Sequence, residues 1–286
     1  MARLYVLGGG GWVPTAKRST NCFLLETRRS AILFDCGAGA ARLGDPMFRA
    51  VLKRVPRVLV LLSHYHHDHI EGLHYLPFFL KDHEVVLACP PAKVTGIAPP
   101  EALRRFGGRP FLPRPFSEWG AIFPKGFEVV ELREGRNRVL GESVEVAAEP
   151  HTDPCVAFRV RDVVYVTDTT ARPETASFAK DAAVLIHDAW LDAEDQEAQH
   201  QDLKVHATAA GAAIVARDAG ARELVLAHLN PAYDEARLER LRFDAAKIFP
   251  RAHLADDFRM LEVRASEADE DGAPVQSSAV DEEAGG

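Results

Sequence analysis

The stretch RVLVLLSHYHHDH, Arg57–His69, decides how this chain is interpreted. It opens as an apolar run typical of a buried strand and ends in a cluster of histidine and aspartate. In an extended chain, residues two apart face the same side, so His64 and His66 can converge on one point. Asp68 and His69 follow where a helical pattern begins, and they can face a second point nearby. Neutral imidazole and carboxylate are the ligands expected of zinc and similar divalent ions. The competing interpretation is a polar, histidine-rich loop without a metal.

The charge of the chain is distributed unevenly. The net charge is -8 over 286 residues, but residues 265–286 contain seven acidic residues and no Lys or Arg. Without them, 34 basic residues face 35 acidic ones, so the remaining body is nearly neutral. A neutral body lacks the broad basic face of proteins that hold long nucleic acids. We expect one folded domain over residues 1–264 and a disordered acidic tail over 265–286, which has too few large apolar residues to fold.

The cysteines and the amino terminus indicate a cytoplasmic protein. Cys22, Cys36, Cys89 and Cys155 are scattered without a CxxC pair, so we expect buried apolar thiols in a reducing compartment. The first residues lead directly into a strand pattern and lack the apolar core of a signal peptide. No stretch approaches the roughly 20 apolar residues of a membrane span. We therefore expect a soluble cytoplasmic chain.

Strand and helix patterns alternate in two halves. Strands are expected at 4–7, 21–26, 31–34, 57–62 and 84–88, with helical patterns over 40–53 and from the histidine cluster to about residue 80. Further strands are expected at 127–132, 138–140, 143–148, 155–160, 163–167, 183–186, 223–227 and 260–263, and helices at 208–219 and 235–247. This order predicts an α/β fold of two sheets packed face to face with helices outside. The segment 90–124, rich in Pro, Gly and aromatic residues, is expected to form an ordered wall of the site.

Two further candidates are predicted to meet although they lie 17 positions apart. Between His151 and Asp168 are two alternating runs, Cys155–Val160 and Val163–Thr167, joined by the short turn Arg161-Asp162. A tight hairpin returns to its starting point, so its two ends are neighbours. Each residue alone is more often structural. Together they form a credible pair of metal ligands.

His228 completes the candidate set because it ends the apolar run Glu223–Ala227 as His64 ends its own run. Sites in α/β folds tend to lie at the carboxyl ends of strands. One zinc ion typically takes about four ligands, so two ions suit the set better, with Asp168 bridging them. The seven candidate ligands are His64, His66, Asp68, His69, His151, Asp168 and His228.

With these residues in place, the chain resembles the metallo-β-lactamase fold superfamily, and within it the ribonuclease Z-like and small phosphodiesterase branch. The stretches that carry the resemblance are HxHxDH at His64–His69, Gly8–Gly11, Ile32–Gly39, Val164–Asp168, Lys204–Ala209 and Leu226–Tyr233. The resemblance covers residues 3–264. It implies a four-layer αββα sandwich and two divalent metal ions, foremost Zn²⁺, with Mn²⁺ or iron as alternatives.

The resemblance also implies roles for single residues. His64, His66, His151 and Asp168 would hold one ion, and Asp68, His69, Asp168 and His228 the other. Asp68 would orient the attacking hydroxide, and His206 would protonate the leaving oxygen, with Asp188 as its acidic partner. For His206 the alternative is a plain residue at the start of a helix. Arg104, Arg105, Arg109 and Arg114 are candidate phosphate contacts, and a solvated face explains them equally well.

Two departures from ribonuclease Z point to a smaller substrate. The interval between His151 and Asp168 leaves no room for the long arm that grips tRNA, and Ala38 and Ala40-Ala41 replace the usual Glu and Thr-Gln. We therefore expect a phosphodiesterase acting on a small phosphodiester, a cyclic nucleotide or a short RNA end, without a membrane partner. The resemblance makes a homodimer plausible. The alternatives are a lactonase- or thioesterase-type carbonyl hydrolase, which needs no leaving-group acid such as His206, and a metal-stabilised binding scaffold without turnover.

Overall fold

Two seven-stranded sheets form the centre of the fold. The structure is a computed structural model that describes residues 2–110, 112–192, 195 and 205–263. The strands of the first sheet are β1 (Ala2–Gly8), β2 (Cys22–Glu26), β3 (Ser30–Phe34), β4 (Arg57–Leu61), β5 (Glu84–Cys89), β6 (Phe127–Glu131) and β14 (Met260–Val263). Those of the second are β7 (Gly135–Val139), β8 (Glu142–Glu149), β9 (Cys155–Val160), β10 (Val163–Val166), β11 (Val184–Asp188), β12 (Glu223–Ala227) and β13 (Ala252–Leu254). Their orders are β14-β1-β2-β3-β4-β5-β6 and β13-β12-β11-β10-β9-β8-β7.

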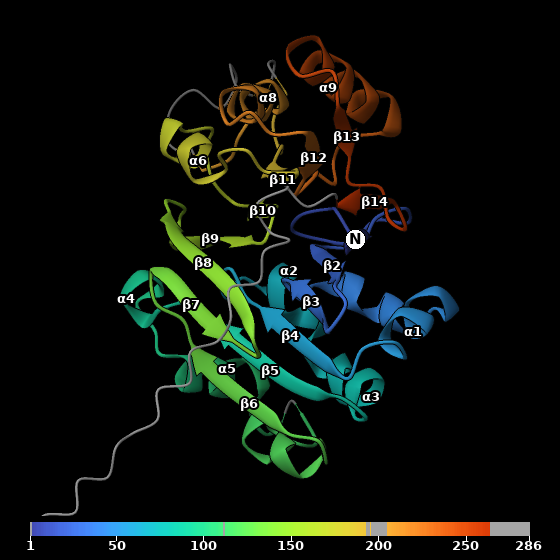
Figure 1. Cartoon of the computed structure of the whole chain (residues 1–286), viewed down its shortest axis with the longest axis vertical. Helices are drawn as coiled ribbons and strands as arrows, with labels where there is room; N and C mark the ends of the chain where they lie inside the picture. Colours follow the sequence, from blue (N-terminus) through green and yellow to red (C-terminus); the bar gives the residue numbers. More distant parts are fainter. Residues whose placement is uncertain (1, 111, 193–194, 196–204, 264–286) are drawn as a thin grey trace, which may run out of the picture.

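Helices cover the outer face of each sheet. The α-helices are α1 (Pro46–Leu52), α2 (His67–Ile70), α3 (Leu76–Leu80), α4 (Ala92–Thr95), α5 (Pro99–Gly107), α6 (Pro173–Phe178), α8 (Ala209–Asp218) and α9 (Glu235–Ile248). Three 3-10 helices are η1 (Ala38–Gly44), η2 (Glu71–Tyr75) and η3 (Phe116–Ala121). In Figure 1, α6, α8 and α9 lie at the top of the view, and α1, α3 and α5 lie in the lower half.

Three apolar layers hold the fold together, because strand side chains alternate between the two faces of each sheet. The layer between the sheets contains Phe34 and Leu59 from the first sheet and Phe158 and Tyr165 from the second. A second layer joins the first sheet to α1, α3, α5, η1 and η3, and a third joins the second sheet to α6, α8 and α9. This arrangement is the predicted αββα sandwich. The predicted acidic tail, residues 265–286, lies outside the described residues.

Parallel pairing brings the chemically important strand ends together. Strands β3 to β6 pair in parallel in the first sheet, and β10 to β13 do so in the second. Parallel neighbours end at the same edge of a sheet, so the residues that follow β3 and β4 share one edge of the first sheet, and those that follow β10 and β12 share one edge of the second. The predicted hairpin is also present, with Val160 opposite Val163 across β9 and β10. All four cysteines are buried and free, as predicted.

Local chemistry explains where the predicted elements differ from the structure. The expected helix over 40–53 is two elements, because Pro46 supplies no N–H and Asp45 caps α1 by accepting the Met47 N–H. The expected helix from the histidine cluster to residue 80 is divided into α2, η2 and α3. The wall at 90–124 contains α4, α5 and η3, and its Phe116 and Trp119 pack on the outer face of the first sheet. Helix α6 and the three-residue strand β13 were not expected.

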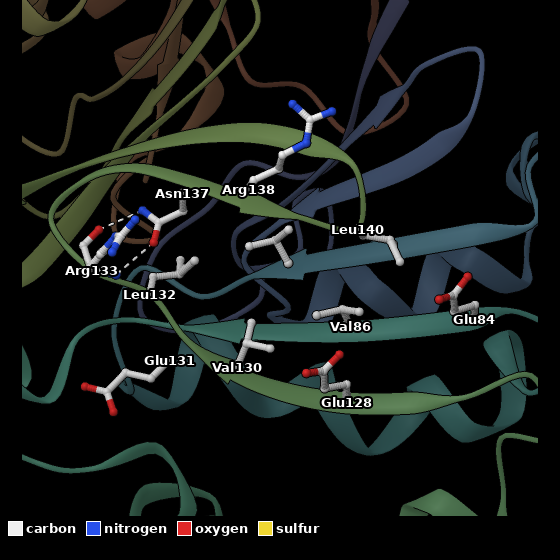
Figure 2. A pocket seen from close by; sticks show the side chains of 11 residues that line it. Glu84, Val86, Glu128, Val130, Glu131, Leu132, Arg133, Asn137, Arg138 and Leu140 are labelled. Carbon is white, nitrogen blue, oxygen red and sulfur yellow. Dashed lines mark hydrogen bonds between the residues drawn. The ribbon is translucent and has the colours of Figure 1, made fainter. Parts of the chain in front are cut away.

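A cavity between the edge strands β6 and β7 is not the predicted site. Its lining includes Val86, Val130 and Leu132, together with Glu128 and Arg138 (Figure 2). None of the predicted ligands lines this cavity.

Among the described residues, no helix has the length and apolarity that crossing a membrane requires.

Candidate metal centre

The first group of predicted ligands converges from three separate segments. His64 and His66 follow β4, His151 lies between β8 and β9, and Asp168 follows β10. One donor atom from each lies within 4.8 Å of the donor atoms of the others. His151 Nε2 lies 3.6 Å from Asp168 Oδ1, which is the proximity that the hairpin predicted. The structure therefore brings together all four residues of the first predicted set.

The second group adjoins the first through Asp168. Donor atoms of Asp68, His69 and His228 lie within 4.8 Å of one another. Asp168 Oδ2 lies 3.1 Å from His69 Nε2, and Asp168 Oδ1 lies 3.3 Å from His228 Nε2. Asp68 Oδ2 lies 3.4 Å and 3.3 Å from the same two nitrogens. Asp168 is thus placed between the two groups, as a bridging carboxylate requires.

The backbone takes an uncommon conformation where strands deliver these side chains. Asp35 and His228 directly follow parallel strands, Asp168 comes two residues after one, and the three have φ of 55°, 54° and 54° for Asp35, Asp168 and His228. A positive φ is uncommon for residues with a side chain, and it costs about 1–3 kcal/mol for each. Such strain persists where the surrounding structure imposes it, and it clusters at functional sites. Here it turns three polar side chains into the space beyond the strand ends.

Asp35 orients two of the candidate ligands, a role that the sequence analysis did not assign. Its carboxylate is fully buried and accepts a bond from His69 Nδ1 at 2.7 Å. It also accepts the Ser63 N–H and hydroxyl at 2.7 and 2.8 Å and the Tyr165 hydroxyl at 2.6 Å. The Ser63 hydroxyl in turn lies 3.0 Å from His64 Nδ1. These bonds fix both imidazoles with Nε2 directed to the cluster, as carboxylates behind metal-binding histidines do.

The donor atoms fit a divalent cation. His64 Nε2 is buried and has no hydrogen-bond partner among the described residues. A buried ring nitrogen without a partner is costly unless a ligand satisfies it. Burial and His69 hold the pKa of His64 well below its usual range. Burial acts to raise the pKa of Asp168, but His228 and His69 outweigh it and hold that pKa well below its usual range. Neutral imidazole and ionised carboxylate are the forms that bind metals.

The charge of the cluster also calls for a cation. Burial acts to lower the pKa of His69, but Asp168, Asp68 and Asp35 outweigh it and raise that pKa well above its usual range. Three carboxylates around one buried imidazole leave an excess of negative charge, and a proton on His69 only partly neutralises it. A divalent ion at this point would neutralise it more completely.

His206 and Asp188 form a pair beside the two groups. Asp188 ends β11 and accepts His206 Nδ1 at 2.8 Å through Oδ2, so His206 Nε2 remains available. The other oxygen of Asp188 accepts the N–H groups of Trp190 and Ala207 at 3.2 and 3.0 Å. Burial acts to lower the pKa of His206, but Asp188 outweighs it and raises that pKa. His206 also offers a donor atom within 4.8 Å of Asp168 and His228.

The glycine-rich loop after β1 approaches the cluster closely. A Cβ added to Gly11 would lie 2.5 Å from His228 Nε2, so only glycine leaves room for this imidazole. The next residue, Trp12, donates its backbone N–H to Asp68 Oδ2 at 2.7 Å. Trp12 has a φ of 60°, and its side chain was not among the expected site residues.

Other candidates from the sequence have different partners. His66 Nε2 lies 2.9 Å from Oδ2 of Asp153, which was not expected and competes with a cation for this nitrogen. His187 is fully buried, and its Nδ1 bonds the backbone carbonyl of Asp188. The exposed side chains of Arg104 and Arg105 bond Glu101. Arg109 likewise pairs with Glu118 at 3.2 Å. These three arginines therefore form ion pairs on the surface of the segment 90–124.

Comparison with known proteins places this geometry in a family. The β-lactamase superfamily domain matches residues 30–229. A ribonuclease Z of Haloferax volcanii is 30% identical, over 95% of this chain and 98% of that protein. The metallo-β-lactamase fold protein YhfI of Bacillus subtilis superimposes with a TM-score of 0.70 at 22% identity, covering 92% of this chain and all of that one. The short form of human tRNase Z superimposes with a TM-score of 0.66 at 19% identity, covering 92% and 99% of the two chains.

These similarities confirm the predicted resemblance, the αββα fold and the expectation of a metal-dependent hydrolase. The fold implies divalent metal ions, for which the two groups around Asp168 are the candidate ligands. The chain belongs to the metallo-β-lactamase superfamily, in its ribonuclease Z-like branch.

Proposed function

We propose that the chain is a dinuclear metal-dependent phosphodiesterase that acts on a small phosphodiester, a cyclic nucleotide or a short RNA end. The observation that carries this proposal is the position of Asp168 between two histidine groups, with His206 beside them. In the proposed site, His64, His66, His151 and Asp168 hold one ion. Asp68, His69, Asp168 and His228 hold the other. Zn²⁺ suits these imidazole and carboxylate donors best.

The ions and the protein divide the chemistry between them. Two divalent ions supply Lewis acidity, which acidifies water and neutralises the charge that develops on phosphate oxygens. Asp68 would orient the nucleophile, and its Oδ2 accepts the Trp12 N–H at 2.7 Å, which restrains the carboxylate. Asp35 holds His69 in one tautomer through its 2.7 Å bond to Nδ1. Preorganised groups of this kind lower the barrier because they need no rearrangement during the reaction.

His206 is proposed as the proton donor to the leaving oxygen. Asp188 binds Nδ1, which fixes the ring and leaves Nε2 to carry and release the proton. The negative charge of Asp188 raises the pKa of His206 against the effect of burial, which favours the protonated form that a general acid needs. A positioned general acid contributes typically about 10²–10⁴-fold to the rate. An alkoxide leaving group of a phosphodiester benefits most from such a donor.

The shape of the site supports a small substrate. The hairpin of β9 and β10 connects directly through Arg161 and Asp162, so no arm extends from this position. The relatives include proteins named ribonuclease Z, which supports a phosphodiester substrate for this chain as well. The homodimer and the cytoplasmic location stay predictions.

The decisive experiment measures hydrolysis of bis-p-nitrophenyl phosphate by metal-reconstituted protein, with metal content read on the same sample. His206→Ala is expected to lower kcat by about 10²–10⁴-fold on a dinucleotide, whose leaving group is an alkoxide, while both metals are retained. The loss is expected to be much smaller on bis-p-nitrophenyl phosphate, because its nitrophenolate leaves without a proton. The matched control is His253→Ala, because His253 also pairs with a carboxylate, Glu223 at 2.8 Å, but does so on β13 outside the cluster. The control is expected to keep wild-type kcat.

Two outcomes would contradict the proposal. Wild-type turnover of the dinucleotide by His206→Ala would remove the proposed acid and favour attack on a carbonyl, which can be checked with lactones and thioesters. Metal binding without any turnover, unchanged by Asp68→Asn, would favour a binding scaffold.

A further inference from the structure

We propose that the indole of Trp12 is a stacking platform for a planar aromatic ring of the substrate, foremost a nucleobase attached next to the scissile phosphodiester. This inference rests on the proposed function and adds a recognition element to the same site. It accounts for a large aromatic side chain that the proposed chemistry does not use.

Trp12 is exposed although its backbone is firmly held. Its side chain belongs to the most exposed large apolar groups of the described residues, at 71%. Its backbone has a φ of 60°, a conformation that bulky residues rarely adopt, and its N–H is bonded to Asp68 Oδ2 at 2.7 Å. Such backbone outliers persist where surrounding structure imposes them, and they mark functional positions. The loop therefore holds the indole at the rim of the metal centre without burying it.

A series of stacked rings leads from Trp12 to the proposed proton donor. Trp12 and Trp190 stack with ring centroids 6.3 Å apart and planes at 29°. Trp190 stacks on His206 at 5.0 Å and 21°, and His206 on His228 at 5.1 Å and 20°. Trp190 covers part of Trp12, and the high exposure of Trp12 leaves the rest of its ring open. A planar ring placed on Trp12 would continue the series outward.

A nucleobase fits this position by its chemistry. Bases stack on aromatic side chains with little regard to sequence, because every base has a π-face. The bond between the Trp12 backbone and Asp68 places the platform at the rim of the cluster. A base stacked there has its attached phosphodiester close to the proposed ligands. Stacking without base-edge contacts predicts that purines and pyrimidines are both accepted.

The side chain of Trp12 can be changed without removing its backbone bond to Asp68. Trp12→Leu keeps apolar bulk but removes the ring, and Trp12→Phe keeps a smaller ring. Phe78→Leu is the matched control, because Phe78 is 75% exposed on α3 and its ring packs against Phe79. Metal content and thermal midpoint are measured for each variant, so that a damaged loop is separated from a lost stacking surface.

The first assay compares an adenylyl-adenosine dinucleotide with its two analogues that lack one base on either side of the phosphate. Removal of one base is expected to raise KM and to lower kcat/KM by about 10-fold or more, which corresponds to the usual value of base stacking on an aromatic side chain. Trp12→Leu is expected to abolish this preference, Trp12→Phe to keep most of it, and Phe78→Leu to leave it unchanged. Equal kcat/KM for all three substrates, or a full preference in Trp12→Leu, would overturn the inference.

The second assay needs no turnover. Trp119 and Trp190 are 2% and 9% exposed, so fluorescence quenching by added ligand reports mainly on Trp12. Saturable quenching of tryptophan emission by 5′-AMP supports the platform if ribose 5-phosphate does not cause it. The same quenching must also be absent from Trp12→Phe, measured at the same emission wavelength. Equal effects of both ligands would overturn it. If no phosphodiester is hydrolysed, the proposed function fails, and the quenching assay still decides the role of Trp12.

Discussion

Asp35→Asn removes the buried charge behind the candidate ligands while keeping the local backbone. Asp35 has a φ of 55°, and Asn tolerates this left-handed conformation about as well as Asp does. The carboxylate accepts four bonds, from the Ser63 N–H and hydroxyl, His69 Nδ1 and the Tyr165 hydroxyl. An amide has one oxygen, so its NH₂ group must face at least one of these donors.

The structure allows the cost to be worked out. If the amide oxygen accepts from His69 and from the Ser63 and Tyr165 hydroxyls, the NH₂ group must face the Ser63 N–H. Two donors then face each other without an acceptor, which costs about 1–3 kcal/mol. The three remaining bonds lose the assistance of a charge, which is worth roughly 1 kcal/mol for each. We expect a loss of roughly 4–6 kcal/mol in unfolding free energy, seen as a fall of roughly 10–20 °C in the thermal midpoint of the metal-free protein. We also expect a roughly 10–100-fold loss in metal affinity, because the orientation of His69 is no longer fixed.

The assay pairs chelator-competition titration of Zn²⁺ with thermal unfolding in chelator. Glu142→Gln is the matched control, since Glu142 is also buried and accepts the Ser30 hydroxyl and Arg161, away from the cluster. The control is expected to lose stability and keep wild-type metal affinity. If Asp35→Asn binds zinc as tightly as the wild type, the account of Asp35 as the group that orients His69 is refuted.

Three further predictions follow from the same geometry. Gly11→Ala is expected to weaken metal binding because its Cβ would lie 2.5 Å from His228 Nε2, whereas Gly120→Ala, with open space at the Cβ, is expected to change nothing; zinc titration of both variants checks this. Arg104 and Arg105 hold the pKa of Glu101 at about 2, so Arg104→Gln is expected to raise that pKa toward 4.5 in a ¹³C NMR titration and to leave phosphodiester kcat/KM unchanged. Removal of metal by chelation is expected to lower the thermal midpoint, because a ligand present at about 1,000 times its Kd adds about 4 kcal/mol to the free energy of unfolding. Equal midpoints with and without metal would contradict a cation-binding site.

The convergence of the candidate ligands could be predicted because simple rules govern strand ends. The apolar runs before His64 and His228 predict strands that each deliver a histidine at the carboxyl end, and the hairpin before Asp168 predicts a return to His151. These inferences need only the two-residue period of strands and a short turn. All seven candidate residues accordingly lie in the two adjoining groups.

The supporting residues could not be predicted in the same way. Asp35 follows a strand in a sequence that also suits an ordinary turn, and its partner Tyr165 lies 130 positions away. The exposed ring of Trp12 gives no periodic signal, because it lies in a loop. Its value depends on Trp190 and His206, which only the tertiary structure brings near. Long-range contacts of this kind carry no local pattern.

A zinc-edge anomalous diffraction map of zinc-loaded crystals tests the central claim most directly. The account predicts two peaks on either side of Asp168, one contacted by His64, His66 and His151 and the other by Asp68, His69 and His228. A single peak, or two peaks of which only one contacts Asp168, would contradict a dinuclear centre bridged by this residue.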